Sequence, residues 1–314
     1  MIILFIGNFD HPFCTEVHHK LTFEKLGHEV IAFQENRSNI NDIIAQVDLV
    51  DMLYWTHTHS FRLGRDEEVT RMLALYKEKG VPTVGYHLDL FLGIEREKTL
   101  HTDPYWDLQH FFTVDKLMAD WLNANTKTKG YYLPAGVFED ECYMAKPDRE
   151  RYPHEIVFTG SLGYHKEYPY RQKLIGWLHS TYGNRFAHYG GGGLPSLRGH
   201  ELNTLYASAK IVIGDTLCKN FDYPYYFSDR FFEVPGRGGF MIAPNIQGIE
   251  ELYVPGKEII LYEYNDMWEL KLHIDAYLEA HDSREEIRYE GHQRAKSEHT
   301  YTNRLQTIFN TLKL

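Results

Sequence analysis

The sequence predicts two α/β domains, each built around a parallel β-sheet. Short apolar runs of strand length alternate with segments of helical length along the chain, which is the pattern of consecutive βαβ units. The runs at 2–6 and 209–214 are almost continuously apolar, as in strands that helices cover on both faces. A chain of 314 residues is long enough for two domains of ordinary size, each with its own core.

The first domain is expected to span residues 1–150 and to open with a βαβ unit. Ile2–Ile6 forms the first strand, Gly7–Asp10 turns the chain, and a helix runs to Leu26 ahead of the strand 29–33. The later helices of this domain are expected at 40–47, 66–79 and 116–124, and its later strands at 49–55, 81–86, 111–114 and 131–133.

Polar residues follow several of these strands at their carboxyl ends, which is where open parallel sheets bind ligands. They are Gly7, Asn8, Asp10, His57, His59, His87 and Asp89. His57 and His59 share one face of an extended strand, which is a spacing that two metal ligands use. Because the pattern supplies no third ligand and the chain has 18 histidines, we expect no metal there. Asp10 suits a turn, and His87 with Asp89 suits either a substrate site or an anchored loop.

The second domain is expected at 151–297, after a connecting stretch rich in charge and proline. Its strands at 155–159 and 186–189 each lead into glycines, which let a backbone approach a phosphate or a flat ring closely. The other elements are expected as a helix at 199–208, strands at 209–214, 239–243 and 258–262, a helix at 267–280, and a helical segment at 283–314 that breaks near 298–304.

The stretch after the strand 209–214 carries the strongest functional pattern. Ser228 and Asp229 stand where a helix cap would stand, so the helix after them would aim its positive end at an anion. Arg230 suits a phosphate, and Glu233, one turn further on, suits the paired hydroxyls of a ribose. Together they predict a nucleotide site, and the alternative is a surface ion pair between the two side chains.

These motifs resemble those of a known family. The segment Ser228-x-Arg230-x-Phe232-Glu233, the glycines that follow it, and Gly160-Ser161 with Tyr168-Pro169-x-Arg171 are similar to the spore-coat-protein CgeB-like glycosyltransferases, relatives of the retaining glycosyltransferase group 1. The resemblance runs from about residue 156 to residue 304. It implies the GT-B fold, with two Rossmann-like domains facing across a cleft and a C-terminal helix at 298–314 that packs back on the first domain.

The resemblance also implies a division of labour between the domains. The second domain would bind a nucleotide-sugar, expected to be a UDP-sugar, with Glu233 at the ribose and Arg230 at the diphosphate as a catalytic group. The other expected donor-binding residues are Gly160, Ser161, Arg171, Tyr189, Gly190, Asp215, Ser228 and Phe232, with Lys166 as a weaker candidate. The expected acceptor-side residues are Gly7, Asn8, Asp10, His57 and His59.

The implied reaction is hexosyl or pentosyl transfer to a hydroxyl of a glycan, protein, small molecule or modified DNA, with retention and without a required cofactor or metal. Bond breaking passes through an oxocarbenium-like state. Retention needs no strong protein base, because an oxygen of the leaving group can take the acceptor proton. If the reaction inverts instead, a base is required, and Asp89 or His87 is the expected one.

Composition bears on the alternatives. A net charge of −11 argues against broad nucleic-acid binding, and so against a phage-type transferase that acts on hydroxymethylated DNA bases. A non-catalytic nucleotide-binding or assembly protein on the same scaffold is the other alternative. Cys14, Cys142 and Cys218 are scattered and odd in number, which favours a reducing compartment. With no charged leader and no apolar run of about 18 residues, we expect a cytoplasmic protein.

Overall fold

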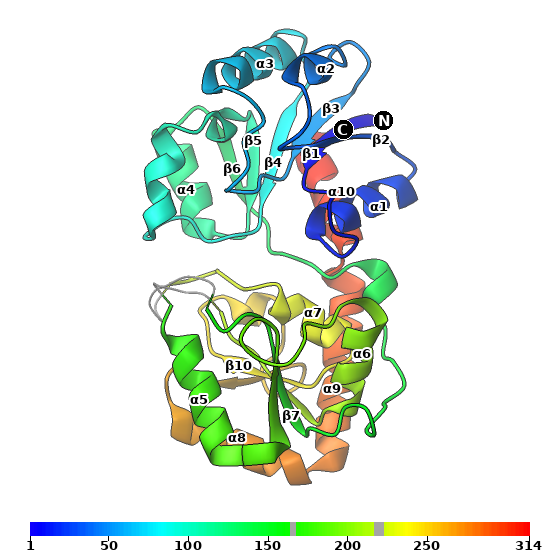
Figure 1. Cartoon of the computed structure of the whole chain (residues 1–314), viewed down its shortest axis with the longest axis vertical. Coiled ribbons are helices and arrows are strands. Elements are labelled where there is room, and N and C mark those ends of the chain that lie inside the picture. Colours follow the sequence, from blue (N-terminus) through cyan, green and yellow to red (C-terminus); the bar gives the residue numbers. More distant parts are fainter. Residues whose placement is uncertain (164–167, 217–222) are drawn as a thin grey trace. The chain divides into compact units, whose positions relative to one another are not determined.

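The computed structural model of the chain describes residues 1–163, 168–216 and 223–314. The chain divides into two compact units (Figure 1). The first unit contains residues 1–134 and 301–314, and the second contains residues 135–300. Lys166 and Cys218 lie outside the described residues.

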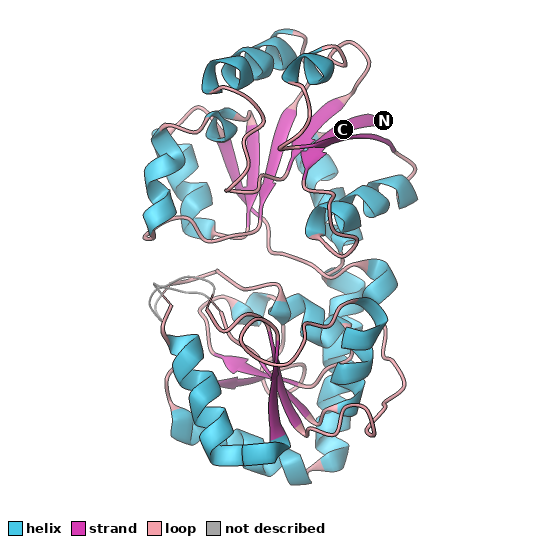
Figure 2. Ribbon diagram, viewed as in Figure 1, coloured by secondary structure: helices cyan, strands magenta, loops and turns pink. Residues whose placement is uncertain are grey.

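The first unit is built on a six-stranded parallel sheet with the strand order β2-β1-β3-β4-β5-β6, flanked by helices (Figure 2). The expected order of strands and helices is confirmed. The strands are β1 (Ile2–Gly7), β2 (Glu29–Gln34), β3 (Met52–Trp55), β4 (Thr83–His87), β5 (His110–Thr113) and β6 (Lys129–Tyr132). The helices are α1 (Thr15–Lys25), α2 (Ile40–Ile44), α3 (Asp66–Glu78), α4 (Lys116–Asn125) and α10 (Tyr301–Leu312), with the 3₁₀ helices η1 (Glu95–His101) and η2 (Pro104–Asp107).

Alternation along the first strand explains how this sheet is covered on both faces. Leu4 and Ile6 of β1 belong to the core cluster that includes residues of α2 and α3. Phe5 points to the other face, where its ring lies 6.2 Å from that of Phe23 in α1. Because successive side chains of a strand face opposite ways, a strand between two helical layers is apolar at every position.

The C-terminal helix α10 is part of the first unit. Its Tyr301 ring lies 4.5 Å from His19 and its Phe309 ring lies 5.8 Å from Phe23, both on α1. Leu305 and Ile308 between them are completely buried. The last residues of the chain therefore complete a core that the first residues begin.

The second unit is built on a five-stranded parallel sheet with the order β11-β10-β9-β7-β8. The strands are β7 (Ile156–Thr159), β8 (Phe186–Tyr189), β9 (Ile211–Ile213), β10 (Met241–Pro244) and β11 (Ile260–Tyr262). The helices are α5 (Tyr170–Tyr182), α6 (Gly199–Ser208), α7 (Arg230–Gly236), α8 (Met267–Glu279) and α9 (His281–Glu298), with the 3₁₀ helices η3 (Glu139–Glu141), η4 (Gly183–Arg185) and η5 (Ile249–Glu251).

The division between the units comes earlier than the expected boundary at residue 150. The stretch 135–150 is not a loose connection, because it makes buried contacts in the second unit. Glu141 forms an ion pair with the buried Arg237, and the backbone oxygen of Glu141 accepts a hydrogen bond from Asn203 Nδ2 at 2.8 Å. These buried partners tie the stretch to the second sheet.

Both sheets have a topological switch point. The second strand of each sheet lies on one side of the first and the third lies on the other, so the chain reverses direction between β1 and β3 and between β7 and β9. Open α/β sheets bind ligands outside the carboxyl ends of the strands at such a point.

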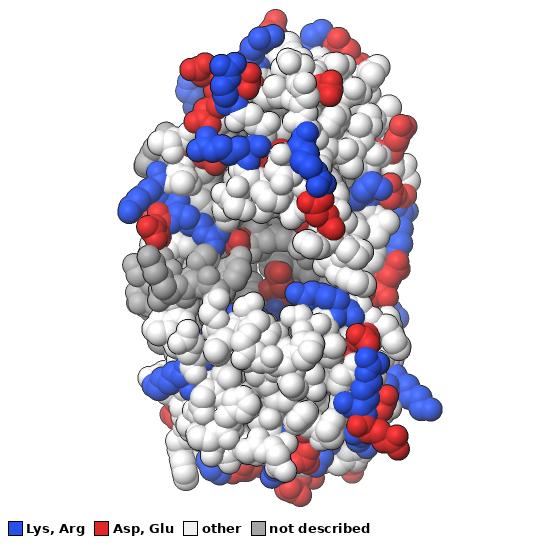
Figure 3. All heavy atoms as spheres, in the orientation of Figure 1, with Lys and Arg blue, Asp and Glu red and all other residues white. Residues whose placement is uncertain are grey.

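On the face that Figure 3 draws, basic and acidic side chains are interspersed. No helix in the described ranges is long and apolar enough to cross a membrane.

Candidate functional site

The switch point of the second sheet gathers three charged side chains from three elements. Gly160 and Ser161 follow β7, and Asp215 follows β9 after Gly214. Arg171 stands in the first turn of α5, and Arg230 is the first residue of α7. The sequence predicted each of these residues as part of the donor site, and the fold brings them together at the ends of adjacent strands.

Arg171 and Asp215 form a buried ion pair. Nε of Arg171 donates to Oδ2 of Asp215 at 2.7 Å, and Nη1 donates to the backbone oxygen of Ser161 at 3.0 Å. The two side chains are 3% and 1% exposed. Nη2 of the arginine and Oδ1 of the aspartate have no hydrogen-bond partner within the parts of the chain that the structure describes. Buried polar atoms of this kind are satisfied by water or by a ligand.

Arg230 has no carboxylate within 4.0 Å among residues 1–163, 168–216 and 223–314. Its Nε donates to the backbone oxygen of Thr159 at 2.6 Å, and its guanidinium lies 5.0 Å from the centre of the Phe158 ring. Burial and the nearby charge of Arg171 lower the pKa of Arg230 to about 10. Arg230 therefore stays protonated at neutral pH, and among the residues that the structure describes Asp215 is the carboxylate that pairs with Arg171. The site carries net positive charge.

Two glycines make room for this arrangement. A Cβ atom on Gly160 would lie 1.9 Å from Nη2 of Arg230, and one on Gly190 would lie 2.3 Å from the backbone oxygen of Gly160. Both glycines have φ near +135°, a conformation that other residues rarely adopt. The N–H of Gly160 donates to the backbone oxygen of Tyr189 at 2.8 Å, which holds the two turns together.

Glu233 lies on α7 and its side chain is 33% exposed. Its Oε1 is 3.4 Å from Nη2 of the buried Arg237, whose guanidinium also pairs with Glu141 and donates to Asn203. The alternative of an Arg230–Glu233 ion pair is wrong, because each of the two side chains contacts another group. Ser228 does not act as the expected cap, since its Oγ donates to the backbone oxygen of Asp215 at 2.7 Å.

Two residues predicted to bind the donor lie elsewhere. Phe232 is completely buried, with its ring 5.5 Å from that of His299, so it belongs to the core. Tyr189 is 7% exposed, and its hydroxyl lies 3.4 Å from Nδ1 of His154. The donor-binding role expected of these two side chains stays a prediction, and the backbone oxygen of Tyr189 accepts the hydrogen bond from the N–H of Gly160. His299 is buried with Nε2 2.9 Å from the oxygen of Leu252.

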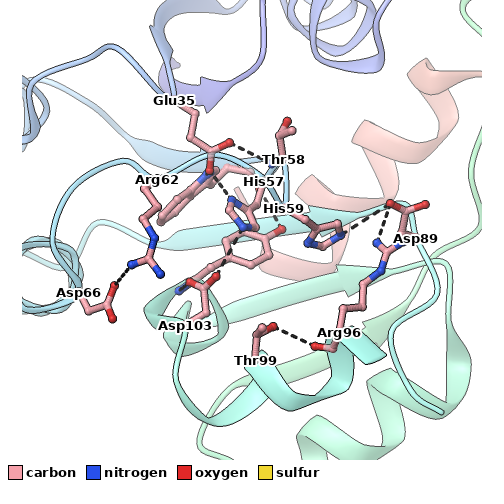
Figure 4. Close-up of polar contacts among 12 residues, drawn as sticks. Glu35, His57, Thr58, His59, Arg62, Asp66, Asp89, Arg96, Thr99 and Asp103 are labelled. Carbon is pink, nitrogen blue, oxygen red and sulfur yellow. Dashed lines mark hydrogen bonds and ion pairs between the residues drawn. The ribbon is translucent and has the colours of Figure 1, made fainter. Parts of the chain in front are cut away.

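The first unit holds a second polar cluster at its own switch point (Figure 4). His57, two residues after β3, lies with Nδ1 against Oε1 of Glu35 and with Nε2 3.5 Å from Oδ2 of Asp103. Glu35 is fully buried and also accepts hydrogen bonds from Trp55 Nε1 at 2.8 Å and from the N–H of Thr58 at 2.9 Å. Burial lowers the pKa of His57, but the hydrogen bonds to Asp103 and Glu35 outweigh it and raise that pKa to about 9.

His59 and Asp89 lie beside this cluster. Nε2 of His59 is 3.7 Å from Oδ2 of Asp89, and Nη1 of Arg96 donates to the same oxygen at 3.0 Å. Burial raises the pKa of Asp89, but the contact with His59 and the charge of Arg96 outweigh it and hold that pKa well below its usual range. Burial lowers the pKa of His59. At neutral pH this group therefore contains a carboxylate, a guanidinium and a neutral imidazole.

His87 is not on the surface of this cluster. It is 2% exposed, with its ring 5.4 Å from Phe91, 5.5 Å from Trp106 and 5.0 Å from His59. Burial pushes its pKa well below the ordinary value, so the ring is neutral. These contacts make His87 a core residue, which agrees with the anchored-loop alternative better than with a place in a substrate site.

The three residues expected after β1 have structural contacts. Glu16 of α1 lies across the end of this strand, so that a Cβ atom on Gly7 would lie 2.9 Å from Cγ of Glu16. The backbone oxygen of Asn8 accepts a hydrogen bond from Cys14 Sγ at 2.9 Å. Asp10 pairs with Arg37 at the surface, as suits the turn residue that was expected.

Two cavities of the first unit lie at opposite ends of its sheet. The larger, about 610 Å³, opens beside Thr83, His110 and Lys129 at the amino ends of β4, β5 and β6. The smaller, about 250 Å³, opens at the carboxyl end of β3 beside His57 and Asp103. Because parallel sheets bind ligands at their carboxyl ends, the smaller cavity is the relevant one. Nowhere in residues 1–163, 168–216 or 223–314 do three or more histidine, cysteine or acidic side chains form a group that could hold a metal.

Sequence reasoning missed Glu35, Arg96 and Asp103. Glu35 directly follows β2, so its place at a strand end was a usable signal. Asp103 caps η2 by accepting from the N–H of Tyr105 at 3.0 Å, and an Asp-Pro pair is a common helix start. Arg96 had no comparable signal.

Solved structures with the same arrangement cover the whole chain. HepE of Anabaena in complex with UDP-glucose matches with a TM-score of 0.66 at 13% identity, over 100% of this chain and 99% of that one. Sucrose-phosphate synthase from Thermosynechococcus elongatus matches with a TM-score of 0.64 at 10% identity, over 100% and 99%. A glycosyltransferase from Rickettsia africae matches with a TM-score of 0.62 at 13% identity, over 99% and 97%.

The chain has the GT-B fold. Residues 168–310 of this GT-B chain also match the family described as glycosyl transferase-like. That match contains Arg171, Asp215, Arg230 and Glu233, and so covers most of the charged cluster in the second unit. No protein of curated function matches the sequence.

Proposed function

We propose that this protein is a glycosyltransferase that moves a hexosyl or pentosyl group from a UDP-sugar to a hydroxyl acceptor with retention, as in the CgeB-like family that its motifs resemble. One observation carries the proposal. Arg171 and Arg230 meet at the switch point of the second sheet, and among the described residues one carboxylate, Asp215, pairs with Arg171, which leaves positive charge for a diphosphate. The glycosyl transferase-like match over the same residues supports it.

The arginines would act on the leaving group. When the anomeric carbon separates from the diphosphate, the departing oxygens gain negative charge. A guanidinium already fixed at that place binds the transition state more strongly than the ground state. Arg230 is fixed by Thr159 and by the Phe158 ring, so little reorganisation is needed. The two arginines also supply the charge that a metal ion would supply, and we propose that no metal is required.

Glu233 would bind the ribose. Its side chain is partly exposed, and its Oε1 lies 3.4 Å from Nη2 of Arg237. A carboxylate pairs well with two adjacent hydroxyls, because each hydroxyl can donate to one oxygen. UDP is the proposed carrier because HepE, with the same fold, binds UDP-glucose. Free thiols at Cys14 and Cys142 agree with a cytoplasmic location.

The first unit contains the side chains that could act as a base if the reaction inverts the anomeric configuration. Asp89 is held ionised by its contact with His59 and by the charge of Arg96, so it is a weak base. His57 is protonated between two carboxylates, and the His87 ring is buried. His59 is the neutral imidazole of the group, with Asp89 beside it to orient its ring. If the reaction inverts, His59 takes the place of His87 and Asp89 as the candidate base. Retention predicts that His59→Ala keeps measurable transfer.

The test is turnover of a panel of UDP-, GDP- and dTDP-sugars, followed by proton NMR of the anomeric product and repeated in EDTA. Arg230→Gln is expected to lower kcat by about 10²–10³, the usual loss for one donor to a developing anion. Arg151→Gln, at an exposed ion pair of the same unit, is the control and keeps the activity. Glu233→Gln is expected to weaken UDP binding. Absence of turnover with every donor, or an unchanged Arg230→Gln enzyme, overturns the proposal.

A further inference from the structure

Arg237 is a buried arginine that directly follows α7, the helix that carries Arg230 and Glu233. Its N–H donates to the backbone oxygen of Glu233 at 2.9 Å and so closes the last turn of this helix. Its side chain is 2% exposed, although a guanidinium in a protein keeps its charge. A buried charge is costly unless it is paired, so the partners of Arg237 show what the charge is used for.

The guanidinium of Arg237 contacts two carboxylates and an amide. Its Nη2 lies against Oε2 of Glu141 and 3.4 Å from Oε1 of Glu233, and its Nη1 donates to Oδ1 of Asn203 at 2.7 Å. Burial lowers the pKa of Arg237, but the charges of Glu233 and Glu141 outweigh it and raise that pKa. One guanidinium thus joins the exposed side of α7 to a buried group behind it.

The buried partners hold Arg237 in place by themselves. Nδ2 of Asn203 donates to the backbone oxygen of Glu141 at 2.8 Å, while Oδ1 of the same amide accepts from Arg237. The turn beside them is closely packed, since a Cβ atom on Gly238 would lie 2.6 Å from Cγ of Met144. The position of the Arg237 guanidinium is therefore set by the fold and needs no ligand.

Glu233 depends on Arg237 for its own position. The Glu233 side chain is 33% exposed, and within the described ranges the contact from Nη2 of Arg237 is the one hydrogen bond that it accepts. A long exposed side chain loses rotamer freedom when a ligand orders it, which weakens binding. Holding one carboxylate oxygen beforehand reduces that cost, and the carboxylate still has lone pairs for the hydroxyls of a ligand.

We propose that Arg237 is a positioning residue that acts through Glu233 and makes the donor site select a ribose that has both of its hydroxyls. This inference rests on the proposed function, because it takes Glu233 as the ligand of the ribose. It adds that the 2′-hydroxyl is recognised, so a ribonucleotide is preferred to its deoxy counterpart. Arg237 takes no part in the transfer itself.

The test is titration calorimetry on the full chain with UDP and with 2′-deoxy-UDP. The ratio of the two affinities isolates the ribose, because the uracil and the diphosphate are the same in both. The wild type is expected to prefer UDP about tenfold, the usual effect of one hydrogen bond to a charged group. Arg237→Met is expected to reduce this preference to about twofold, because Glu233 must then be ordered by the ligand.

Arg288→Met is the matched control, because it places the same residue at another buried arginine of the second unit. Nη2 of Arg288 donates to the backbone oxygen of Ala209 at 2.6 Å, ahead of the amino end of β9 and so away from the switch point. This variant is expected to lose stability and to keep the wild-type ratio of affinities. A purely structural role of Arg237 would give the two variants the same ratio.

Glu233→Gln tests whether Arg237 acts through Glu233. The variant is expected to lose the preference for UDP, and Arg237→Met added to it is expected to change the ratio no further, because the two residues act as one unit. Arg237→Met leaves Glu141 without its ion-pair partner and can prevent folding. In that case Glu141→Gln combined with Arg237→Met removes the unpaired charge, and the ratio is measured on this variant.

The outcomes separate the inference from the proposed function. A wild-type ratio in the Arg237→Met variants, or a further loss when Arg237→Met is added to Glu233→Gln, overturns the inference. Equal binding of UDP and 2′-deoxy-UDP by the wild type also overturns it, while the turnover assay with nucleotide-sugars still tests the transfer reaction. A wild type that binds neither nucleotide refutes the proposed function itself.

Discussion

At the end of β7, the guanidinium of Arg230 occupies the space that a side chain on Gly160 would fill. The glycine lacks a Cβ atom in the place where that atom would lie 1.9 Å from Nη2 of Arg230. Gly160 also has a φ of +135°, so the position requires glycine for two reasons: the backbone conformation and the lack of a side chain. The position of the guanidinium thus depends on a residue that carries no charge.

Gly160→Ala is expected to displace Arg230 and to weaken UDP binding about as much as Arg230→Gln does. The physical reason is steric, because the new methyl group and the guanidinium cannot both stay in place. Titration calorimetry with UDP measures the effect. Gly163→Ala is the matched control, since among the described residues its Cβ atom would meet Gln172 at an ordinary 3.6 Å and nothing closer. Wild-type affinity in Gly160→Ala would show that Arg230 does not need this position.

Asp215→Ala is expected to destabilise the second unit by about 3–5 kcal/mol, because it leaves the buried Arg171 guanidinium without its ion-pair partner. Urea unfolding followed by fluorescence gives the loss. The double variant Arg171→Met, Asp215→Leu is expected to recover most of the stability, since a hydrophobic pair often replaces a buried ion pair at little cost. If the double variant regains stability but does not bind UDP, the Arg171–Asp215 pair has two separable roles, one in stability and one in UDP binding.

The stability that His57 contributes is expected to fall as the pH rises from about 6.5 to about 9. In the folded protein its pKa is raised to about 9, while an unfolded histidine titrates near 6.5. Below 6.5 both states hold the proton and the contribution is complete, and above 9 neither does and it is lost. The free energy of unfolding of wild type minus that of His57→Gln is measured at pH 6 and at pH 9.5.

A smaller difference at pH 9.5 agrees with this sign, and an equal or larger one contradicts it. His11→Gln, at an exposed position, is the control and shows no such change.

Glu35→Gln is expected to lower the pKa of His57 in an NMR titration, because one of the two carboxylate partners of His57 is gone.

Gly130→Ala is expected to destabilise the first unit by about 1–3 kcal/mol through overpacking. A Cβ atom at this position on β6 would lie 2.4 Å from the backbone oxygen of Ala119 in α4, and backbone cannot move aside as a side chain can. Gly176→Ala in α5 has open space around the new atom and is expected to add about 0.5–1 kcal/mol. Thermal unfolding of both variants checks the opposite signs, and equal effects would refute the packing argument.

The helices and strands could be predicted from the sequence because each depends on a pattern of neighbouring residues. The helix expected at 199–208 is α6, Gly199–Ser208, and the break expected near 298–304 separates α9 from α10. Asp215 stands next to a strand end, and Arg171 and Arg230 stand at the starts of helices, so all three could be placed near the carboxyl edge of the sheet.

The features that the sequence did not predict depend on how strands and helices are arranged in space. Glu35 reaches His57 because β1 lies between β2 and β3, and strand order is not written in a single sequence. Phe232 was expected in the donor site because it belongs to the motif that resembles the known family, and a helix of seven residues does not show in its sequence which face is buried. Arg96 lies on the 3₁₀ helix η1 and Asp103 caps η2, and such helices are too short to give a periodic pattern.

The placement of Tyr301–Leu314 in the first unit has a consequence for synthesis. Domains usually fold in order as they leave the ribosome, the N-terminal one first. Here residues 135–300 are contiguous and emerge together, while the core started by residues 1–134 waits for residues 301–314. The later-made unit can therefore mature before the earlier one, and loss of residues 301–314 would leave the core of the first unit unfinished.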